Sequence, residues 1–246
     1  MARILYALYV RLIFAPVFIV LTMMAALATI VGCMLGGKRI FSYYPGMIWA
    51  RLACRLALCP VRIRGSEHVQ RSRPAVYVAN HQGAVDIFLI FGFLGVPVKW
   101  VMKLGLVKIP FVGAACRAAG FVFVNHKTLK AATESLIEAE RLLQAGSSIF
   151  IFPEGSRTTT GKMGRFKKGA FQIAVNRRVP VIPITLNGPF DALPIGSLNL
   201  RRRPLEIVVH PPILTESSDA SHESVRRLAD EAFAVISSAL WEPYAG

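Results

Sequence analysis

Beyond residue 60, the sequence alternates between short apolar runs and segments with apolar residues at helical spacing. The apolar runs, of strand length, cover residues 61–64, 75–79, 98–102, 121–124, 148–152, 179–186 and 205–210. The helical patterns cover residues 127–144, 168–178 and 221–241. Strands that alternate with helices predict an α/β fold, with a mainly parallel central sheet flanked by helices.

The part of the chain before this pattern is strongly apolar. Residues 12–37 carry no charge, and a helix over them would be about 39 Å long, enough to cross a hydrocarbon core of about 30 Å. Pro16 also permits a helix that tilts or lies in one leaflet, and cations on both sides leave its orientation open. We expect residues 1–60 to form an N-terminal membrane-anchoring helical segment and residues 61–246 to form one α/β domain.

The segment 40–60 is apolar but contains Arg51 and Arg55, which lie on one face of a helix. Tyr43, Tyr44 and Trp49 lie close by. This composition favours a helix at the membrane interface, where arginines reach the headgroups. The alternative is an ordinary helix that packs on the domain.

Charge is distributed unevenly along the chain. There are 29 Lys and Arg residues against 14 Asp and Glu residues, for a net charge of +15. The first acidic residue is Glu67, and none occurs between Asp86 and Glu134 or between Glu154 and Asp191. A basic surface beside an apolar leader fits anionic lipid headgroups and phosphorylated substrates. We expect no nucleic-acid partner, since no nucleic-acid-binding motif is present.

The four cysteines match neither a zinc-ligand spacing nor the disulfide framework of a small secreted protein. Reduced thiols are the simpler interpretation, which agrees with a domain that faces the cytoplasm. No glycine-rich nucleotide loop and no His/Cys metal cluster occurs in the sequence, and Ser156 lacks the context of a hydrolase nucleophile.

The first candidate site motif is NHQGAVD at residues 80–86. It follows the apolar run 75–79, so His81 is placed at the carboxyl end of a strand, where open α/β sheets bind ligands. On one continuous helix His81 and Asp86 would be about 140° apart, so a break near Gly83 is required. Asp86 in the next helix would then accept the Nδ1 proton and leave Nε2 as a base. The alternative is a histidine in a turn and an aspartate that caps a helix.

The second motif is FPEGSRT at residues 152–158, after the apolar run 148–152. Backbone N–H groups near Gly155 and the guanidinium of Arg157 are suited to hold a phosphate. Further cations follow closely, namely Lys162, Arg165, Lys167 and Lys168. The alternative is a surface turn with incidental charges.

Together with two more blocks, these motifs resemble the glycerophospholipid acyltransferase superfamily, and most closely the 1-acyl-sn-glycerol-3-phosphate acyltransferases. The blocks occur in the family order: NHQGAVD at 80–86, GFVFVNH at 120–126, FPEGSRT at 152–158 and VPVIPI at 179–184. The stretch KWVMKLGLVKIPFVG at 99–113 also resembles the family's segment before the second block.

The resemblance implies acyl transfer from acyl-CoA or acyl carrier protein to the sn-2 hydroxyl of lysophosphatidate, with no bound cofactor. It implies His81 as general base and Asp86 as the residue that orients it. It also implies acceptor binding or loop organisation by Glu154, Gly155 and Arg157, a phosphate contact at Lys103, and a site-shaping role for the block around Pro180 and Pro183. The expected location is the inner (cytoplasmic) membrane, with the active site facing the cytoplasm.

The second block departs from the family pattern. It ends in His126 where an arginine that binds the acceptor phosphate is usual, and a neutral histidine holds phosphate less firmly. We expect both His126 and Lys127 to contact the substrate, with Lys127 able to compensate. The alternatives are acylation of another lysolipid, either a lysophospholipid or a lyso-aminolipid, and a non-enzymatic membrane-bound basic binding protein.

Overall fold

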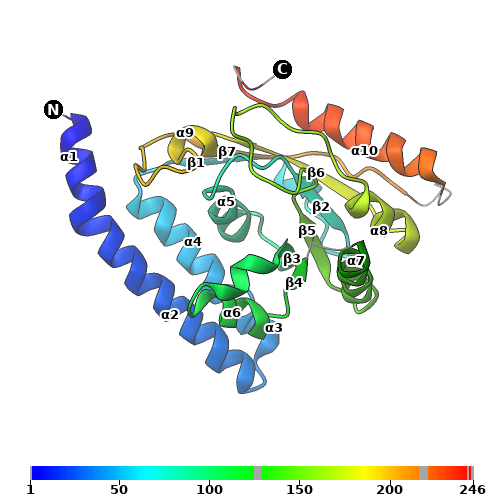
Figure 1. Cartoon of the computed structure of the whole chain (residues 1–246), viewed down its shortest axis with the longest axis horizontal. Helices are drawn as coiled ribbons and strands as arrows, with labels where there is room; N and C mark the ends of the chain where they lie inside the picture. Colours follow the sequence, from blue (N-terminus) through cyan, green and yellow to red (C-terminus); the bar gives the residue numbers. More distant parts are fainter. Residues whose placement is uncertain (1, 125–128, 216–220, 243, 245–246) are drawn as a thin grey trace.

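The computed structural model describes residues 2–124, 129–215, 221–242 and 244, and its centre is a seven-stranded sheet of order β1-β7-β6-β2-β5-β3-β4 (Figure 1). The strands are β1 (Val61–Arg64), β2 (Val76–Ala79), β3 (Val98–Lys103), β4 (Val122–Val124), β5 (Ser148–Ile151), β6 (Val181–Asn187) and β7 (Leu205–Val209). The β6–β7 pair is antiparallel and the other pairs are parallel. The predicted α/β fold with a mainly parallel sheet is confirmed.

All seven predicted strands are present, with ends that differ from prediction by at most two residues. β2 lies between β5 and β6 and is buried along its whole length. A strand buried on both faces reads as a continuous apolar run. The carboxyl ends of β2, β5, β3 and β4 lie at the same edge of the sheet because these strands are parallel. This edge holds the candidate site.

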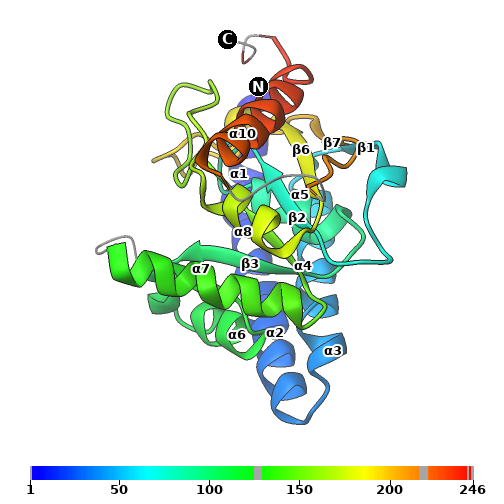
Figure 2. The same cartoon turned by 90° about the vertical axis from the view of Figure 1, so that its right-hand side faces the viewer.

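Helices cover both faces of the sheet (Figure 2). One apolar core lies under α4 (Tyr44–Leu56) and α5 (Asp86–Phe93). The other lies under α7 (Leu129–Gln144), α8 (Gly169–Arg177) and α10 (His222–Ser237). The last helix is shorter than the predicted 221–241, because the chain after Ser237 turns to hydrogen-bond with β6.

The N-terminal segment is helical from Ala2 to Met34, in α1 (Ala2–Tyr9), a π-helical turn (Val10–Phe14) and α2 (Ala15–Met34). The helix therefore begins earlier than the predicted residue 12 and continues through Pro16, which lies just after the π-helical turn. Within the described chain, Arg3–Met34 is the helix long and apolar enough to cross a membrane.

One side of α2 packs against α4 and α6 (Val112–Ala118), so the helix runs along the α/β domain rather than away from it (Figure 1). Trp49 Nε1 donates to Thr22 Oγ1 at 2.9 Å, and the Phe18 ring meets the Phe88 ring of α5 edge-on. The opposite side of α2 is exposed and apolar. The anchoring role of residues 1–60 stays a prediction.

The expectation that α4 lies at the membrane interface stays a prediction. Arg51 lies against α5, where its Nε donates to the Gly92 carbonyl at 2.6 Å, while Arg55 is exposed. Small buried residues, Ala50 and Ala53, allow α4 and α5 to pack closely. One face of α4 thus packs on the domain, while Tyr44, Ile48 and Arg55 of the same helix are exposed.

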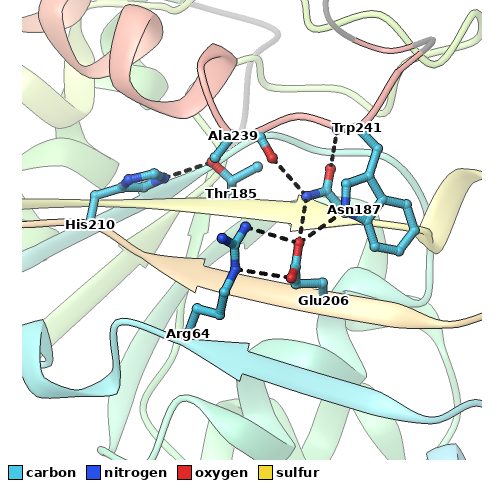
Figure 3. Close-up of polar contacts among 7 residues, drawn as sticks. All are labelled: Arg64, Thr185, Asn187, Glu206, His210, Ala239 and Trp241. Carbon is cyan, nitrogen blue, oxygen red and sulfur yellow. Dashed lines mark hydrogen bonds and ion pairs between the residues drawn. The ribbon is translucent and has the colours of Figure 1, made fainter.

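A buried polar network joins the C-terminal segment to the sheet (Figure 3). Asn187 of β6 donates to Glu206 at 3.2 Å and to the Ala239 carbonyl at 2.9 Å, and its Oδ1 accepts from Trp241 N–H at 3.0 Å. Glu206 also accepts from the Trp241 indole and forms an ion pair with Arg64 of β1. The network therefore links both strands of the antiparallel pair, the sheet edge and the chain after α10.

This network should contribute measurably to stability. Asn187→Ala leaves the Ala239 carbonyl and the Trp241 N–H without their partner, which should lower the free energy of unfolding by about 2–4 kcal/mol. The exposed Asn176→Ala is the matched control and should change it by less than about 0.5 kcal/mol. Urea unfolding in detergent measures both; equal effects would contradict the assigned role of the network.

Candidate active site

The loop after β2 is attached to β6 by the amide of Asn80. Asn80 Nδ2 donates to the Leu186 carbonyl at 2.9 Å, and Asn80 Oδ1 accepts from Leu186 N–H at 2.8 Å. The side chain is almost fully buried and supplies the pair of bonds that a backbone ladder would make. Asn80 therefore fixes where the chain leaves the sheet, directly before His81.

His81 and Asp86 are brought together as predicted. His81 Nδ1 lies 2.6 Å from Asp86 Oδ2, and the same oxygen accepts from Gly83 N–H at 2.9 Å. Asp86 is the first residue of α5, where the helix end favours a negative charge. No described residue hydrogen-bonds the other ring nitrogen, Nε2, and the His81 side chain is 17% exposed. The pair can therefore present Nε2 toward a reactant.

Gly83 serves this loop in a different way than expected. The sequence suggests a glycine that permits a sharp turn, yet Gly83 is not among the described residues with positive φ. A Cβ at this position would lie 3.3 Å from the Pro189 carbonyl oxygen. A larger residue would have to displace the 189–193 segment slightly, so glycine fits this position best, and its N–H donates to Asp86.

The ring of Phe152 stacks on the imidazole of His81, with centroids 3.8 Å apart and planes at 7°. Phe152 directly follows β5, so neighbouring parallel strands deliver the two rings to the same edge. Stacking fixes the plane of the imidazole, while Asp86 fixes its rotation in that plane. Phe152 belongs to the second motif, but its partner could not be read from the sequence.

Glu154 connects the two motifs. Its Oε1 accepts from His81 N–H at 2.7 Å, and its Oε2 accepts from Gly164 N–H at 2.7 Å. Thr158 N–H also donates to the His81 carbonyl at 2.9 Å. Both Glu154 oxygens are engaged by backbone donors and the side chain is buried. Glu154 thus organises the loops rather than facing an acceptor.

Burial controls the titration of both carboxyl groups. Burial raises the pKa of Asp86, and the hydrogen bonds from His81 and Gly83 oppose that rise. Burial likewise raises the pKa of Glu154, opposed by the hydrogen bonds from the His81 and Gly164 N–H groups. Each buried carboxylate has donors that offset its desolvation.

That backbone N–H groups near Gly155 hold a phosphate stays a prediction, but the N–H of Gly155 itself is engaged within the turn. Gly155 N–H donates to the Phe152 carbonyl at 3.0 Å within the turn. The residue has φ +75°, and a Cβ would lie 2.6 Å from Lys167 Nζ. Gly155 therefore shapes the turn and makes room for the Lys167 side chain.

The cations of the site lie on its exposed side. Lys103 is the last residue of β3, and Arg157 follows the Glu154 turn; both are exposed. Neither forms an ion pair with a carboxylate in the described ranges. Lys162, Arg165 and Lys167 are exposed in the loop beyond. His126 and Lys127 lie outside the described residues.

An apolar cavity of about 520 Å³ adjoins the site. It lies between the N-terminal helix and the domain, with walls from Phe14 and Phe18, from Cys54 of α4 and from Phe88 of α5. Val85, the residue before Asp86, also lines it. The cavity therefore reaches the loop that carries the His81–Asp86 pair.

The His81–Asp86 pair, a rim of exposed cations and an apolar cavity thus lie together at one edge of the sheet. The model of the family described as "Acyltransferase" matches residues 60–187, and the chain belongs to this family.

Individual relatives agree with this assignment. The chain is 33% identical to the chloroplastic 1-acyl-sn-glycerol-3-phosphate acyltransferase BAT2 of Brassica napus, over 81% of the chain and 58% of that protein. It is 32% identical to 1-acyl-sn-glycerol-3-phosphate acyltransferase alpha of Homo sapiens, over 69% of the chain and 60% of that protein. The chain thus spans less than two thirds of the length of these relatives.

A solved structure covers the fold more completely. The 1-acyl-sn-glycerophosphate (LPA) acyltransferase PlsC of Thermotoga maritima aligns with a TM-score of 0.79 and 26% identity, over 98% of both chains. The similarity includes the N-terminal helices as well as the α/β domain, since nearly the whole chain is covered.

The raised pKa of Glu154 predicts a pH-dependent stability. A folded state that binds the proton more tightly than the unfolded chain is most stable below the ordinary value of 4.5, and loses that stability as pH rises through the raised pKa. The difference in unfolding free energy between the wild type and Glu154→Gln should therefore fall as pH rises above 4.5.

Urea unfolding across this pH interval measures the difference. Asp86 is present in both proteins, and because its charge acts on Glu154, the comparison reports the titration of Glu154 together with this coupling. The control is Glu138→Gln on the exposed side of α7, for which the difference should be nearly flat. A wild-type advantage that grows with pH would contradict the sign of the shift.

Proposed function

We propose that this chain transfers a fatty acyl group from an acyl thioester to the sn-2 hydroxyl of a 1-acylglycerol 3-phosphate, forming phosphatidate. The observation that carries the proposal is the His81 ring, with Nδ1 on buried Asp86 and Nε2 without a described partner. Family membership and the names of the relatives support the same reaction.

The chemistry requires one base that later acts as an acid. Nε2 of His81 takes the proton of the acceptor hydroxyl while its oxygen bonds to the thioester carbonyl carbon. The tetrahedral intermediate then expels the thiolate as the C–S bond breaks, and the imidazolium returns the proton to that sulfur. Asp86 stabilises the imidazolium and holds the proton on Nδ1. No acyl-enzyme is formed in this route.

The acceptor phosphate is assigned to the exposed cations at the carboxyl edge. Lys103 follows β3 and Arg157 follows the turn after β5, so neighbouring strands deliver both to one side of His81. Arginine suits bidentate contact with phosphate oxygens. His126 and Lys127 complete this set in the proposal, while Glu154 and Gly155 shape the loop that carries Arg157.

The acyl chain is assigned to the apolar cavity beside Val85 and Phe88. Its volume of about 520 Å³ lies within the usual range of ligand sites. The acyl donor is a thioester of coenzyme A or acyl carrier protein, and the reaction needs no resident cofactor. We place residues 1–60 in the inner membrane, with the domain of residues 61–246 on the cytoplasmic side.

The base assignment is tested by assaying purified protein with acyl thioesters and lysophosphatidate. His81→Ala should lower the turnover rate by at least about a hundredfold, the low end for general-base catalysis. Asp86→Asn should lower it in the same direction, since the imidazolium loses its counter-charge. The exposed His222→Ala is the matched control and should keep the wild-type rate. Full activity of His81→Ala would falsify the proposed reaction.

The acceptor assignment is tested separately. Arg157→Gln should raise the KM for lysophosphatidate by about tenfold to a hundredfold, the equivalent of one charged hydrogen bond. The KM for a phosphate-free monoacylglycerol should change little in the same variant. Arg141→Gln on exposed α7 is the control. If the wild type prefers a lysophospholipid or a lyso-aminolipid, the acceptor is that lipid and the base assignment is unaffected.

A further inference from the structure

The segment between β3 and α6, residues 104–111, exposes large apolar side chains beside the candidate site. Leu104 is 43% exposed, Ile109 44% and Phe111 52%, and Lys108 and Pro110 between them are exposed as well. We call this segment the 104–111 turn. Core packing does not account for an exposed isoleucine and phenylalanine one residue apart.

The backbone at Phe111 is strained. Its φ is +60° and its ψ −49°, and Val112 N–H donates back to the Pro110 carbonyl at 2.6 Å. These values describe a γ-turn with positive φ at its centre, a rare and strained form that bulky residues seldom adopt. Strain of this kind concentrates at functional positions. Here it directs an aromatic ring into solvent.

The turn is held firmly by its surroundings. Gly113 N–H donates to the Ile109 carbonyl at 2.9 Å, and Ala115 N–H donates to the Phe111 carbonyl at 2.9 Å. A Cβ on Gly113 would lie 2.1 Å from the Val107 carbonyl oxygen, so the chain approaches itself too closely for any other residue. The exposed side chains are therefore presented by a defined backbone.

The turn continues the apolar outer side of the N-terminal helix. α6 begins at Val112, directly after Phe111, and packs against α2 (Figure 1). The outer side of that helix exposes large apolar residues along its length, including Leu12, Ile19, Met23, Leu27, Val31 and Met34. The 104–111 turn and the apolar outer side of the N-terminal helix are thus connected through α6, which follows the turn and packs on α2.

The charged side chains of the turn and of the segments that flank it in sequence are all positive. Lys103, Lys108 and Arg117 are exposed, and the sequence has no carboxylate between Asp86 and Glu134. Apolar and aromatic side chains rimmed by cations match an interface with anionic headgroups. An anionic lipid leaflet complements the turn in two ways. Its phosphate headgroups complement the cations, and its acyl chains complement the apolar side chains.

We propose that the 104–111 turn is a second membrane contact, which inserts Ile109 and Phe111 into an anionic leaflet beside the N-terminal helix. Two separated contacts fix how the domain is rotated relative to the membrane. A single helix would leave the domain free to rotate about the axis of that helix. Lys103 at the start of the turn then lies at headgroup level, where the phosphate of a lipid acceptor is found. Only this last link rests on the proposed function; the insertion does not.

Insertion is measured on the full chain in vesicles of phosphatidylcholine and phosphatidylglycerol with brominated acyl chains. Phe111→Trp should add a fluorescence component that the bromines quench, beyond the background of Trp49, Trp100 and Trp241. Ile137→Trp, at a 47% exposed position of α7 on the opposite face of the sheet, should add a component that is not quenched. Equal quenching at the two positions would overturn the proposal.

A second pair of variants tests the consequence for activity. Ile109→Ser with Phe111→Ser should lower the rate on a vesicle-embedded lysolipid by about tenfold, comparable to the transfer of one large apolar side chain. Its rate on a short-chain acceptor dissolved as monomers should stay within about twofold. The matched control is Ile137→Ser with Leu214→Ser, two exposed apolar positions elsewhere, and should match the wild type in both assays.

The remaining outcomes are also decisive. An equal loss on the embedded and the dissolved acceptor would mean that the turn acts on the site, and would overturn the membrane role. Sedimentation that shows a dimer abolished by the double variant, with no quenching at position 111, would make the turn an interface between copies instead. Quenching at position 111 in a protein without acyl transfer would support the turn and reject the proposed function.

Discussion

The site depends on a carboxylate that is fully withdrawn from water. Asp86 has no exposed surface, and a buried charge costs several kcal/mol unless donors surround it. Here the His81 ring and the Gly83 N–H both bind Oδ2, and the N-terminus of α5 favours the negative charge, while Oδ1 has no hydrogen-bond partner among the described residues. This arrangement requires the chain to leave β2, make a loop of six residues and begin a helix at Asp86. The buried pair thus constrains both where β2 ends and where α5 begins.

A second buried carboxylate holds the first motif against the second. Glu154 binds the N–H of His81 with one oxygen and the N–H of Gly164 with the other. The imidazole is thus fixed by Asp86, its backbone by Glu154 and its plane by Phe152. Cations occupy the exposed rim and an apolar cavity the interior, so a charged head and an acyl chain can approach the same ring from different sides.

Much of the fold could be predicted because the strands are short apolar runs, buried on both faces, between clear helical patterns. The pairing of His81 with Asp86 was predictable as well. On one continuous helix the two side chains would point about 140° apart, so a base paired with a carboxylate required a loop between them. α5 gave no periodic signal: its sequence DIFLIFGF is apolar all round because the helix packs against both the sheet and α4. α6, only seven residues long, left equally little pattern.

Other features depended on contacts that no spacing reveals. Arg51 donates to the Gly92 carbonyl because α4 packs on α5, a contact that the spacing of Arg51 and Arg55 does not reveal. The N–H of Gly155 closes its own turn by donating to the Phe152 carbonyl, which the motif alone does not show. Asn80 and Phe152 stand within recognisable motifs, yet their partners, Leu186 and His81, come from different strands. The sequence predicted which charged side chains gather at the site, while the hydrogen-bond partner of each group required the structure.

The central claim is that Asp86 holds the proton on Nδ1 of His81 and leaves Nε2 as the base. Nitrogen-15 NMR of the histidine rings in the detergent-solubilised protein tests this directly, with His81 assigned by its disappearance in His81→Gln. For the neutral ring, we predict a proton on Nδ1 and none on Nε2. In Asp86→Asn this preference should be lost. A wild-type ring that carries its proton on Nε2 would contradict the account.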